Sequence, residues 1–392
     1  MNRPLRITLV TETYFPQVNG VSRTLDRLVR HCSGLHDQMQ LLLPRYPQGT
    51  TELPPGVETL DWRAVPLPFY REVVLPLATP GMVTKALAGF HPDVVHIATE
   101  GPLGWAALRA ARRLQLPVVS SYHTNFAEYL GMYHAGWLAP LCWSYLRRFH
   151  NATRMTFCPT SSTRRELEVR GFRNVCVWSR GVDSVRFHPD KRDLELRAAL
   201  GIAPKDIVLA YVGRLAAEKN LDMLAEAWRA FPERNRCRLL FIGDGPLRRR
   251  LAERAGDRCI FAGYRHGEEL ARMYASADLF VFPSLTETFG NVVLEAMASG
   301  LPAIAFAVQG PGDIIEDGCT GRLVTTVHAD ALRQTMSTVV TDEQHRFQMA
   351  RRARRHAETQ SWERIMSGLR NCYLDTLASR SELPDLSQYQ PV

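Results

Sequence analysis

Two glutamates separated by seven residues, Glu287 and Glu295, are the clearest sign of chemistry in the sequence. They lie in the stretch FVFPSLTETFGNVVLEAMASGLP (residues 280–302), where an apolar run predicts a buried strand and a helical pattern begins near Gly290. Ligands of open parallel sheets bind beyond the carboxyl ends of the strands. Carboxylates at such a place can accept hydrogen bonds from sugar hydroxyls. The alternative is that Glu287 caps the helix and Glu295 pairs with a surface arginine.

The backbone at Phe289, Gly290 and Asn291 adds a second feature to this stretch. The first N–H groups of a helix have no partner inside the helix, and the helix dipole favours negative charge there. We therefore expect an anionic or hydroxyl-rich ligand at this point.

Two cations follow another predicted strand. Arg214 and Lys219 come directly after Ile207–Val212, and Gly213 ends that strand. A guanidinium fork and an ammonium point charge together suit a diphosphate. The segment lacks the Gly-Lys-Ser/Thr of a P-loop, which argues against ATP hydrolysis. A solvated helix start is the alternative interpretation.

The elements that would position these residues are repeated βα units, because short β-branched apolar runs alternate with amphipathic stretches. The predicted strands of the first half are Arg6–Thr11, Gln40–Leu43, Val94–Ile97, Val118–Tyr122 and Met155–Pro159. Those of the second half are Ile207–Val212, Arg238–Ile242, Ile260–Ala262, Leu279–Pro283 and Ala303–Ala307. Predicted helices include Val21–Cys32, Pro102–Arg113, Leu221–Phe231 and Gly290–Ala298. The sequence thus predicts an α/β fold with two doubly wound parallel sheets.

The βα series restarts after the segment Asp183–Pro189, which predicts a domain boundary there. We expect an N-terminal domain over residues 1–183 and a second domain over residues 184–363. The remainder, 364–392, continues the amphipathic helix predicted for Trp362–Leu377 and ends in a weakly ordered tail. That helix needs an apolar partner face, which either domain could supply, the N-terminal domain included.

Composition restricts the class of protein. Of 392 residues, 45% are hydrophobic and 22% charged, which is typical of a soluble globular protein, and no apolar run is long enough to span a bilayer. The first apolar residues, Ile7–Val10, predict a strand rather than a signal peptide. Eight scattered cysteines without a Cys-x-x-Cys pair argue against a zinc site or a disulfide framework. A reducing, cytoplasmic location is therefore expected.

These segments together resemble the signature of retaining glycosyltransferase family 4. The resemblance spans nearly the whole chain, in the family's order, and includes TETYFPQVNG (residues 11–20) and SYHTN (residues 121–125). Within the family, the chain is similar to bacterial GDP-mannose-dependent α-mannosyltransferases and glycolipid glycosyltransferases. It implies the GT-B fold, in which an acceptor-side and a nucleotide-sugar-binding Rossmann-like domain face each other across a cleft.

The resemblance also implies donor-binding roles in the second domain. Arg214 and Lys219 would hold the donor diphosphate and stabilise it as the leaving group. Glu287 and the backbone of residues 289–291 would position the hexose. Glu295 would accept hydrogen bonds from the ribose.

Two residues of the first domain complete the implied site. Gly20 would let the backbone approach the donor phosphate and sugar, because a Cβ atom would intrude. His123 would face the donor sugar and the acceptor, although a packed structural histidine is the alternative. His123, Arg214, Lys219 and Glu287 are the expected catalytic residues.

The implied reaction retains the anomeric configuration. A double displacement needs a carboxylate beneath the anomeric carbon, and the segments around Gly20 and His123 offer no obvious one. We therefore expect front-face displacement, with a phosphate oxygen of the leaving group as base. The sequence lacks the Asp-x-Asp motif that binds a divalent metal. The side chains of Arg214 and Lys219 would take the role of the metal. Neither a metal nor a cofactor beyond the donor is therefore expected.

The expected partners are a nucleotide-sugar donor and a lipid or glycan acceptor. GDP-mannose is the expected donor, and UDP-glucose or another UDP-hexose is the alternative. The segments Pro66–Pro80 and Trp143–Arg154 combine apolar, aromatic and cationic residues. They predict either ordinary packing or a peripheral contact with the inner face of the plasma membrane.

Two other classes of function compete with this interpretation. The net charge of +8 could serve nucleic-acid binding, although that would leave Glu287 and Glu295 unexplained, since carboxylates repel phosphate backbones. A nicotinamide dehydrogenase would need Gly-x-Gly-x-x-Gly after the first strand, where Thr-Glu-Thr-Tyr stands instead. The fragment Gly243–Gly245 is interpreted as a turn.

Overall fold

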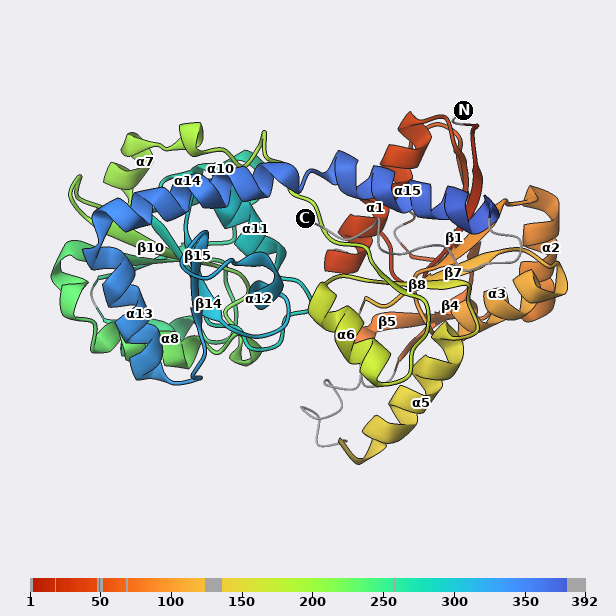
Figure 1. The fold of residues 1–392 in the computed structure, drawn as a ribbon, viewed down its shortest axis with the longest axis horizontal. Helices are drawn as coiled ribbons and strands as arrows, with labels where there is room; N and C mark the ends of the chain where they lie inside the picture. Colours follow the sequence, from red (N-terminus) through yellow and green to blue (C-terminus); the bar gives the residue numbers. More distant parts are fainter. Residues whose placement is uncertain are drawn as a thin grey trace. The chain divides into compact units, whose positions relative to one another are not determined.

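The computed structural model describes residues 3–17, 19–47, 49, 52–67, 70–123, 136–256 and 258–378. The contacts divide the chain into two compact units (Figure 1). Unit 1 comprises Met1–Ser179 and Glu363–Val392, and unit 2 comprises Arg180–Trp362. The sequence prediction placed the two boundaries after residues 183 and 363.

Unit 1 is built on a parallel sheet with seven strands among the described residues, in the order β3-β2-β1-β6-β7-β8-β9. The strands are β1 (Arg6–Val10), β2 (Gln38–Pro44), β3 (Val57–Trp62), β6 (Val94–Ile97), β7 (Val118–Ser121), β8 (Met155–Cys158) and β9 (Val175–Val177). The helices are α1 (Gly20–Gly34), α2 (Pro80–Phe90), α3 (Pro102–Arg113), α5 (Ala139–His150) and α6 (Ser161–Val169). A separate antiparallel pair consists of β4 (Ala64–Leu67) and β5 (Tyr70–Pro76).

The last helix, α15 (Trp362–Ala378), is fastened to unit 1 by two buried polar contacts. The Arg370 guanidinium donates to both carboxylate oxygens of Asp37, at 2.7 and 2.8 Å. The His96 ring lies between the hydroxyls of Tyr373 and Ser121, 2.5 Å from each. Burial lowers the pKa of His96 to about 3, so its ring is neutral. The final helix therefore completes the packing of the N-terminal unit.

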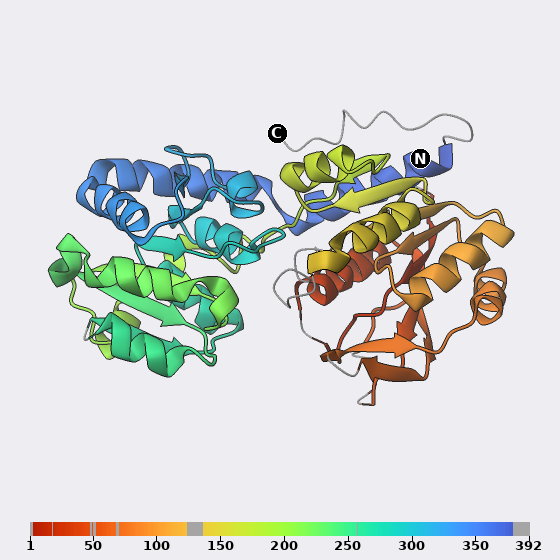
Figure 2. The same cartoon turned by 90° about the horizontal axis from the view of Figure 1, so that it is seen from below.

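Unit 2 is a second parallel sheet, with six strands among the described residues in the order β12-β11-β10-β13-β14-β15. The strands are β10 (Ile207–Val212), β11 (Cys237–Ile242), β12 (Cys259–Gly263), β13 (Leu279–Phe282), β14 (Ala303–Phe306) and β15 (Gly321–Val324). The helices are α7 (Leu194–Ala199), α8 (Leu221–Arg229), α9 (Arg248–Ala255), α10 (Gly267–Ala275), α11 (Asn291–Ala298), α12 (Pro311–Ile314), α13 (Ala329–Thr341) and α14 (Glu343–Thr359). They lie in layers on both sides of the sheet (Figure 2).

Both sheets confirm the prediction of an α/β fold with doubly wound parallel sheets. The central strands are buried on both faces, which explains why they are continuous apolar runs. The prediction missed β3 because its side chains are mostly exposed and its sequence, VETLDW, contains no apolar run. Among the described helices, none is both long and apolar enough to cross a bilayer.

Each sheet has a point at which the chain reverses the direction of winding. In unit 2, β11 and β12 extend the sheet on one side of β10, and the chain then returns to place β13 on the other side. In unit 1, the same reversal places β2 and β6 on opposite sides of β1. In open parallel sheets, ligands bind beyond the carboxyl ends of two such neighbouring strands. The two loops at the reversal in unit 2 carry the predicted cations and carboxylates.

Candidate active site

The cation-bearing loop and the carboxylate-bearing loop follow neighbouring strands. Strands β10 and β13 pair directly, with Leu209 opposite Leu279. The loop after β10 makes a 3-10 turn over Ala217–Lys219, and Asn220 then adopts a left-handed conformation (φ 54°) that leads into α8. The Asn220 side-chain amide donates to the carbonyl of Pro283, at the end of β13 (3.3 Å). This hydrogen bond joins the two loops at the carboxyl ends of β10 and β13.

Lys219 and Glu287 contact each other at this edge of the sheet. The Lys219 ammonium donates to Oε1 of Glu287, and the Ser284 hydroxyl donates to the same oxygen at 3.0 Å. The two charged side chains are mostly buried, with exposed fractions of 22% and 16%. A partly buried charge pair is screened less than a surface pair, so both groups are held in place. A cation suited to phosphate and a carboxylate suited to sugar hydroxyls thus lie side by side.

Arg214 extends from the same loop into solvent. Its side chain is 63% exposed and pairs with Glu218, four residues later, at 2.5 Å. Exposed pairs of this kind contribute about 0–1 kcal/mol. The guanidinium can therefore exchange Glu218 for a ligand phosphate at little cost.

Glu295 lies in the second turn of α11, where a buried tyrosine orients it. The Tyr274 hydroxyl donates to Oε2 of Glu295 at 3.1 Å. Burial, and then the charge of Glu295, raise the pKa of Tyr274 well above its usual value, so the hydroxyl keeps its proton. Tyr274 therefore fixes the direction of the carboxylate.

The start of α11 tests the alternative that Glu287 caps this helix. Gly290 occupies the N-cap position with φ 92°, and no side chain caps the helix. The suggestion that Glu287 caps α11 is therefore wrong, because Glu287 turns instead to Lys219. Phe289 is buried in the core of unit 2, and the buried side-chain oxygen of Asn291 has no hydrogen-bond partner among the described residues.

Glycines of two further loops shape this end of the sheet. A Cβ atom on Gly243, after β11, would lie 2.0 Å from the carbonyl oxygen of Gly213, and one on Gly310 would lie 2.7 Å from that of Phe289. Both glycines have positive φ. The interpretation of Gly243–Gly245 as a turn missed this close approach. The signal in the sequence is a glycine immediately after the strand that ends at residue 242.

The remaining predicted residues belong to unit 1. Gly20 is the first residue of α1 and directly follows the N-cap residue Asn19. The Asn19 side chain accepts a hydrogen bond from the Ser22 N–H at 2.8 Å. His123 follows β7, is buried, and has its ring centre 5.6 Å from that of Trp178. Three positions of the motifs around them, 18, 124 and 125, lie outside the described residues, as do residues 68 and 69 of the predicted membrane-contact segment.

The sequence analysis did not single out a carboxylate at the reversal of unit 1. Oε1 of Glu12 accepts from the Leu103 N–H at 2.8 Å, at the start of α3. A Cβ atom on Gly101 would lie 1.9 Å from the other oxygen, Oε2, so only glycine leaves room for the carboxyl. Burial raises the pKa of Glu12 from 4.5 to about 7. Glu12 therefore carries a proton near neutral pH in a large share of molecules.

Comparisons with known proteins agree with this architecture. Residues 18–186 match the family model described as Glycosyltransferase Family 4, and residues 193–356 match that of Glycosyl transferases group 1. A GDP-mannose-dependent alpha-mannosyltransferase of Corynebacterium glutamicum is 33% identical over 384 residues, covering 97% of this chain and 92% of that protein. A protein of the same name from Mycobacterium tuberculosis (strain CDC 1551) is 35% identical over 371 residues, covering 94% and 96%.

Solved structures resemble the fold at lower identity. A sucrose-phosphate synthase of Thermosynechococcus elongatus has a TM-score of 0.76 at 21% identity, covering 96% of this chain and 100% of that one. HepE of Anabaena, in complex with UDP-glucose, has a TM-score of 0.71 at 19% identity, covering 96% and 100%. The class is therefore defined: the protein is a glycosyltransferase with the GT-B fold. The chain belongs to the retaining glycosyltransferase family 4.

Proposed function

We propose that the protein transfers mannose from GDP-mannose to a hydroxyl of a lipid or glycan acceptor, with retention at the anomeric carbon. Full-length relatives that carry the name GDP-mannose-dependent alpha-mannosyltransferase support this donor. The observation that carries the proposal is the contact between Lys219 and Glu287 at the reversal of unit 2. A cation for the diphosphate lies there beside a carboxylate for the hexose hydroxyls.

The proposed roles follow from these positions. Lys219 and Arg214 bind the diphosphate, and Glu287 accepts hydrogen bonds from the hexose hydroxyls. Glu295, oriented by Tyr274, accepts from the ribose hydroxyls. The N–H groups at the start of α11 lie on the same edge of the sheet and bind hydroxyls or phosphate. The roles of Gly20 and His123 toward donor and acceptor stay predictions.

In the proposed step, the acceptor oxygen forms a bond to the anomeric carbon on the face from which the diphosphate departs. The bond between that carbon and the phosphate oxygen breaks, and the hydroxyl proton passes to an oxygen of the departing diphosphate. Lys219 and Arg214 stabilise the negative charge that develops on the leaving group. Fixed charges aimed at such a group are worth several kcal/mol in the transition state. We propose that they replace a divalent metal.

The donor is tested by thermal shift with GDP, GDP-mannose, UDP and UDP-glucose. We expect the guanosine compounds to raise the melting temperature and the uridine compounds to have no effect. The complex of HepE with UDP-glucose is the reason to include the uridine pair. If only UDP-glucose raised the melting temperature, the donor would be UDP-glucose and the proposed mannosyl transfer would be wrong. Proton NMR of the product then tests retention through its anomeric coupling.

We also propose a peripheral membrane contact on the exposed face of α5 and the preceding turn. Leu141 and Tyr145 are exposed and four residues apart on α5, so they share one face of that helix. Trp137, also exposed, lies in the 3-10 turn directly before α5. Co-sedimentation with vesicles tests this contact. We expect binding by the natural sequence and its loss in Trp137→Ser/Leu141→Ser, and equal binding of both proteins would contradict it.

A further inference from the structure

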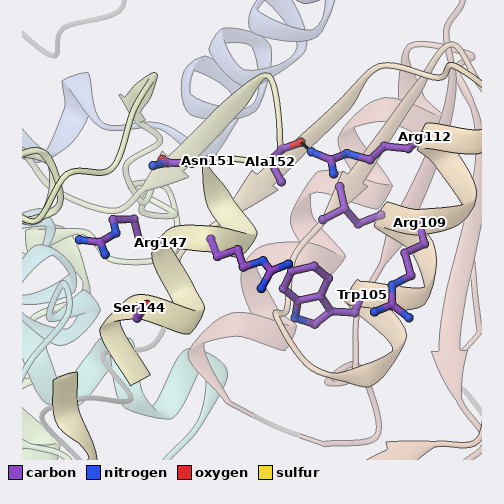
Figure 3. A pocket seen from close by; sticks show the side chains of 9 residues that line it. Trp105, Arg109, Arg112, Ser144, Arg147, Asn151 and Ala152 are labelled. Carbon is purple, nitrogen blue, oxygen red and sulfur yellow. Dashed lines mark hydrogen bonds between the residues drawn. The ribbon is translucent and has the colours of Figure 1, made fainter. Parts of the chain in front are cut away.

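A groove of about 550 Å³ lies in unit 1, between α3 and α5. Figure 3 shows its two sides, with Trp105, Arg109 and Arg112 from α3 and with Ser144, Arg147 and Asn151 from α5 and its end. Arg148 and Leu108 also line it. None of these residues belongs to the candidate active site. A volume of this size is in the range of small-molecule sites.

The groove is lined by four arginines and by no acidic residue. The sequences of α3 (PLGWAALRAARR) and α5 (APLCWSYLRRFH) contain no aspartate or glutamate. Helix α6, by contrast, pairs Arg164 with Glu168 of the same helix. Among the described residues, no carboxylate lies within ion-pair distance of the four groove arginines. Within the described part of the chain, their charge is therefore not balanced by a carboxylate.

Two of the four guanidinium groups are held by backbone carbonyls. Arg112 donates to the carbonyl of Ala152 at 3.0 Å, and Arg147 donates to that of Arg170 at 3.3 Å. A guanidinium has five N–H donors, so most of theirs remain for a ligand. Arg109 and Arg148 make no hydrogen bond within the described part of the chain. The Arg147 side chain extends away from α3 (Figure 3), so the groove combines the fixed guanidinium group of Arg112 with the adaptable ones of Arg109 and Arg148.

Trp105 provides an apolar wall for the groove. Its ring centre lies 5.2 Å from that of Phe149, in an edge-to-face arrangement that fixes the indole. Charges beside an apolar wall are less well screened than charges in open water. An anion bound there would gain more from the arginines than it would on a flat surface.

The helix dipoles explain only part of this arrangement. Cations are favoured in the last turn of a helix by about 0.3–1 kcal/mol each, which accounts for Arg112, Arg147 and Arg148. Arg109 lies before the last turn of α3. It also stands three residues from Arg112, where like charges repel on a helix surface. An anionic ligand that bridges α3 and α5 accounts for Arg109, which the dipole does not explain.

We propose that this groove binds a phosphate ester, distinct from the nucleotide-sugar donor. Arginine forks match the geometry of phosphate oxygens, and the remaining volume accommodates the polar group esterified to the phosphate. The ligand is a phosphomonoester in solution or the phosphodiester of a lipid headgroup. The site does not depend on the proposed donor chemistry.

The test uses calorimetric titration with sn-glycerol 3-phosphate, in the presence of saturating GDP so that the donor site is closed. We expect saturable binding, weakened at least tenfold in Arg109→Gln/Arg148→Gln. Among the described residues these two side chains make no hydrogen bond or ion pair, and an unchanged melting temperature of the same variant shows that it is intact. The matched control is Arg351→Gln/Arg355→Gln on α14, which removes the same charge from another exposed basic helix.

A second control separates the two sites. Lys219→Gln should weaken GDP and leave glycerol phosphate binding unchanged. Absence of saturable binding to the natural sequence, or equal weakening in the α14 control, would overturn the proposal and leave a solvated basic surface.

Vesicles of phosphatidylcholine, with and without phosphatidylglycerol, then identify the source of the phosphate. Flotation with the anionic vesicles that is lost in Arg109→Gln/Arg148→Gln, and competed by glycerol phosphate, supports a lipid headgroup. Soluble binding without groove-dependent flotation supports a free phosphate ester.

Discussion

The buried ion pair between Arg370 of α15 and Asp37 should determine how firmly the C-terminal helix stays packed against the rest of unit 1. The two side chains are 3% and 0% exposed and form a bidentate pair. Asp37 also accepts from the N–H of Leu5 at 2.8 Å, which positions the first strand. Arg370→Met preserves the length of the side chain and removes its charge. The change leaves the Asp37 carboxylate buried, with the Leu5 N–H and the Cys32 thiol as its remaining described hydrogen-bond donors.

The magnitude follows from the burial of the charge that stays behind. Removing one partner of a buried pair costs about 3–5 kcal/mol, because the other charge loses its compensation. For a unit of 150–250 residues, each kcal/mol lowers the melting temperature by about 2–4 °C. We therefore expect the melting temperature of unit 1 to fall by roughly 6–20 °C in scanning calorimetry. The backbone amides of α15 should also exchange their hydrogens faster.

Two further variants test the reasoning. Arg30→Met breaks the exposed pair with Asp26 and should cost about 1 kcal/mol or less. Adding Asp37→Asn to Arg370→Met should restore part of the lost stability, because no unpaired charge remains. A loss in Arg370→Met no larger than that in Arg30→Met would show that α15 is held by apolar packing alone.

Four other outcomes are expected. In an assay of GDP release, Lys219→Gln should lower kcat by about 10²–10³-fold, which is the usual effect of losing one group that stabilises developing charge. Lys205 is an exposed lysine, so Lys205→Gln should leave kcat unchanged in the same assay. Activity should persist in EDTA, and its loss on chelation with rescue by Mg²⁺ would refute the proposal that cations replace a metal. Gly243→Ala should reduce GDP affinity and stability together in a thermal-shift titration, since its Cβ would lie 2.0 Å from a backbone oxygen. Burial raises the pKa of Glu12 from 4.5 to about 7, so the stability that the protonated group contributes is complete below pH 4.5 and is lost as the pH rises through 7. Urea unfolding of the natural sequence at pH 4.5 and at pH 8 should therefore show a loss of at most roughly 3 kcal/mol in the free energy of unfolding. The variant Glu12→Gln should not show this loss.

Strands that are buried on both faces were predicted closely from the sequence. The bounds of β6 and β10 agree with the predicted Val94–Ile97 and Ile207–Val212. Such strands must be continuous apolar runs, so local sequence is sufficient to find them. The short β15 and the exposed β3 carry no such run, and only pairing with a neighbouring strand makes them visible.

The residues of the candidate site were found from spacing, whereas their partners were not. The interval between Glu287 and Glu295 is local, because one loop and one helix contain both. The contact of Glu287 with Lys219 joins residues 68 positions apart, and it exists because the sheet order places β13 beside β10. No local pattern specifies that order.

What the sequence determined by itself is therefore the set of elements and the types of chemical group at their ends, since both follow from short-range periodicity. The tertiary structure alone decided which groups meet. Arg370 reaches Asp37 across 333 positions, and the arginines of α3 and α5 line one groove, only because packing brings distant segments together. Burial also sets the charge of groups such as Glu12 and His96, because the cost of ionisation depends on the surroundings that the fold builds around them.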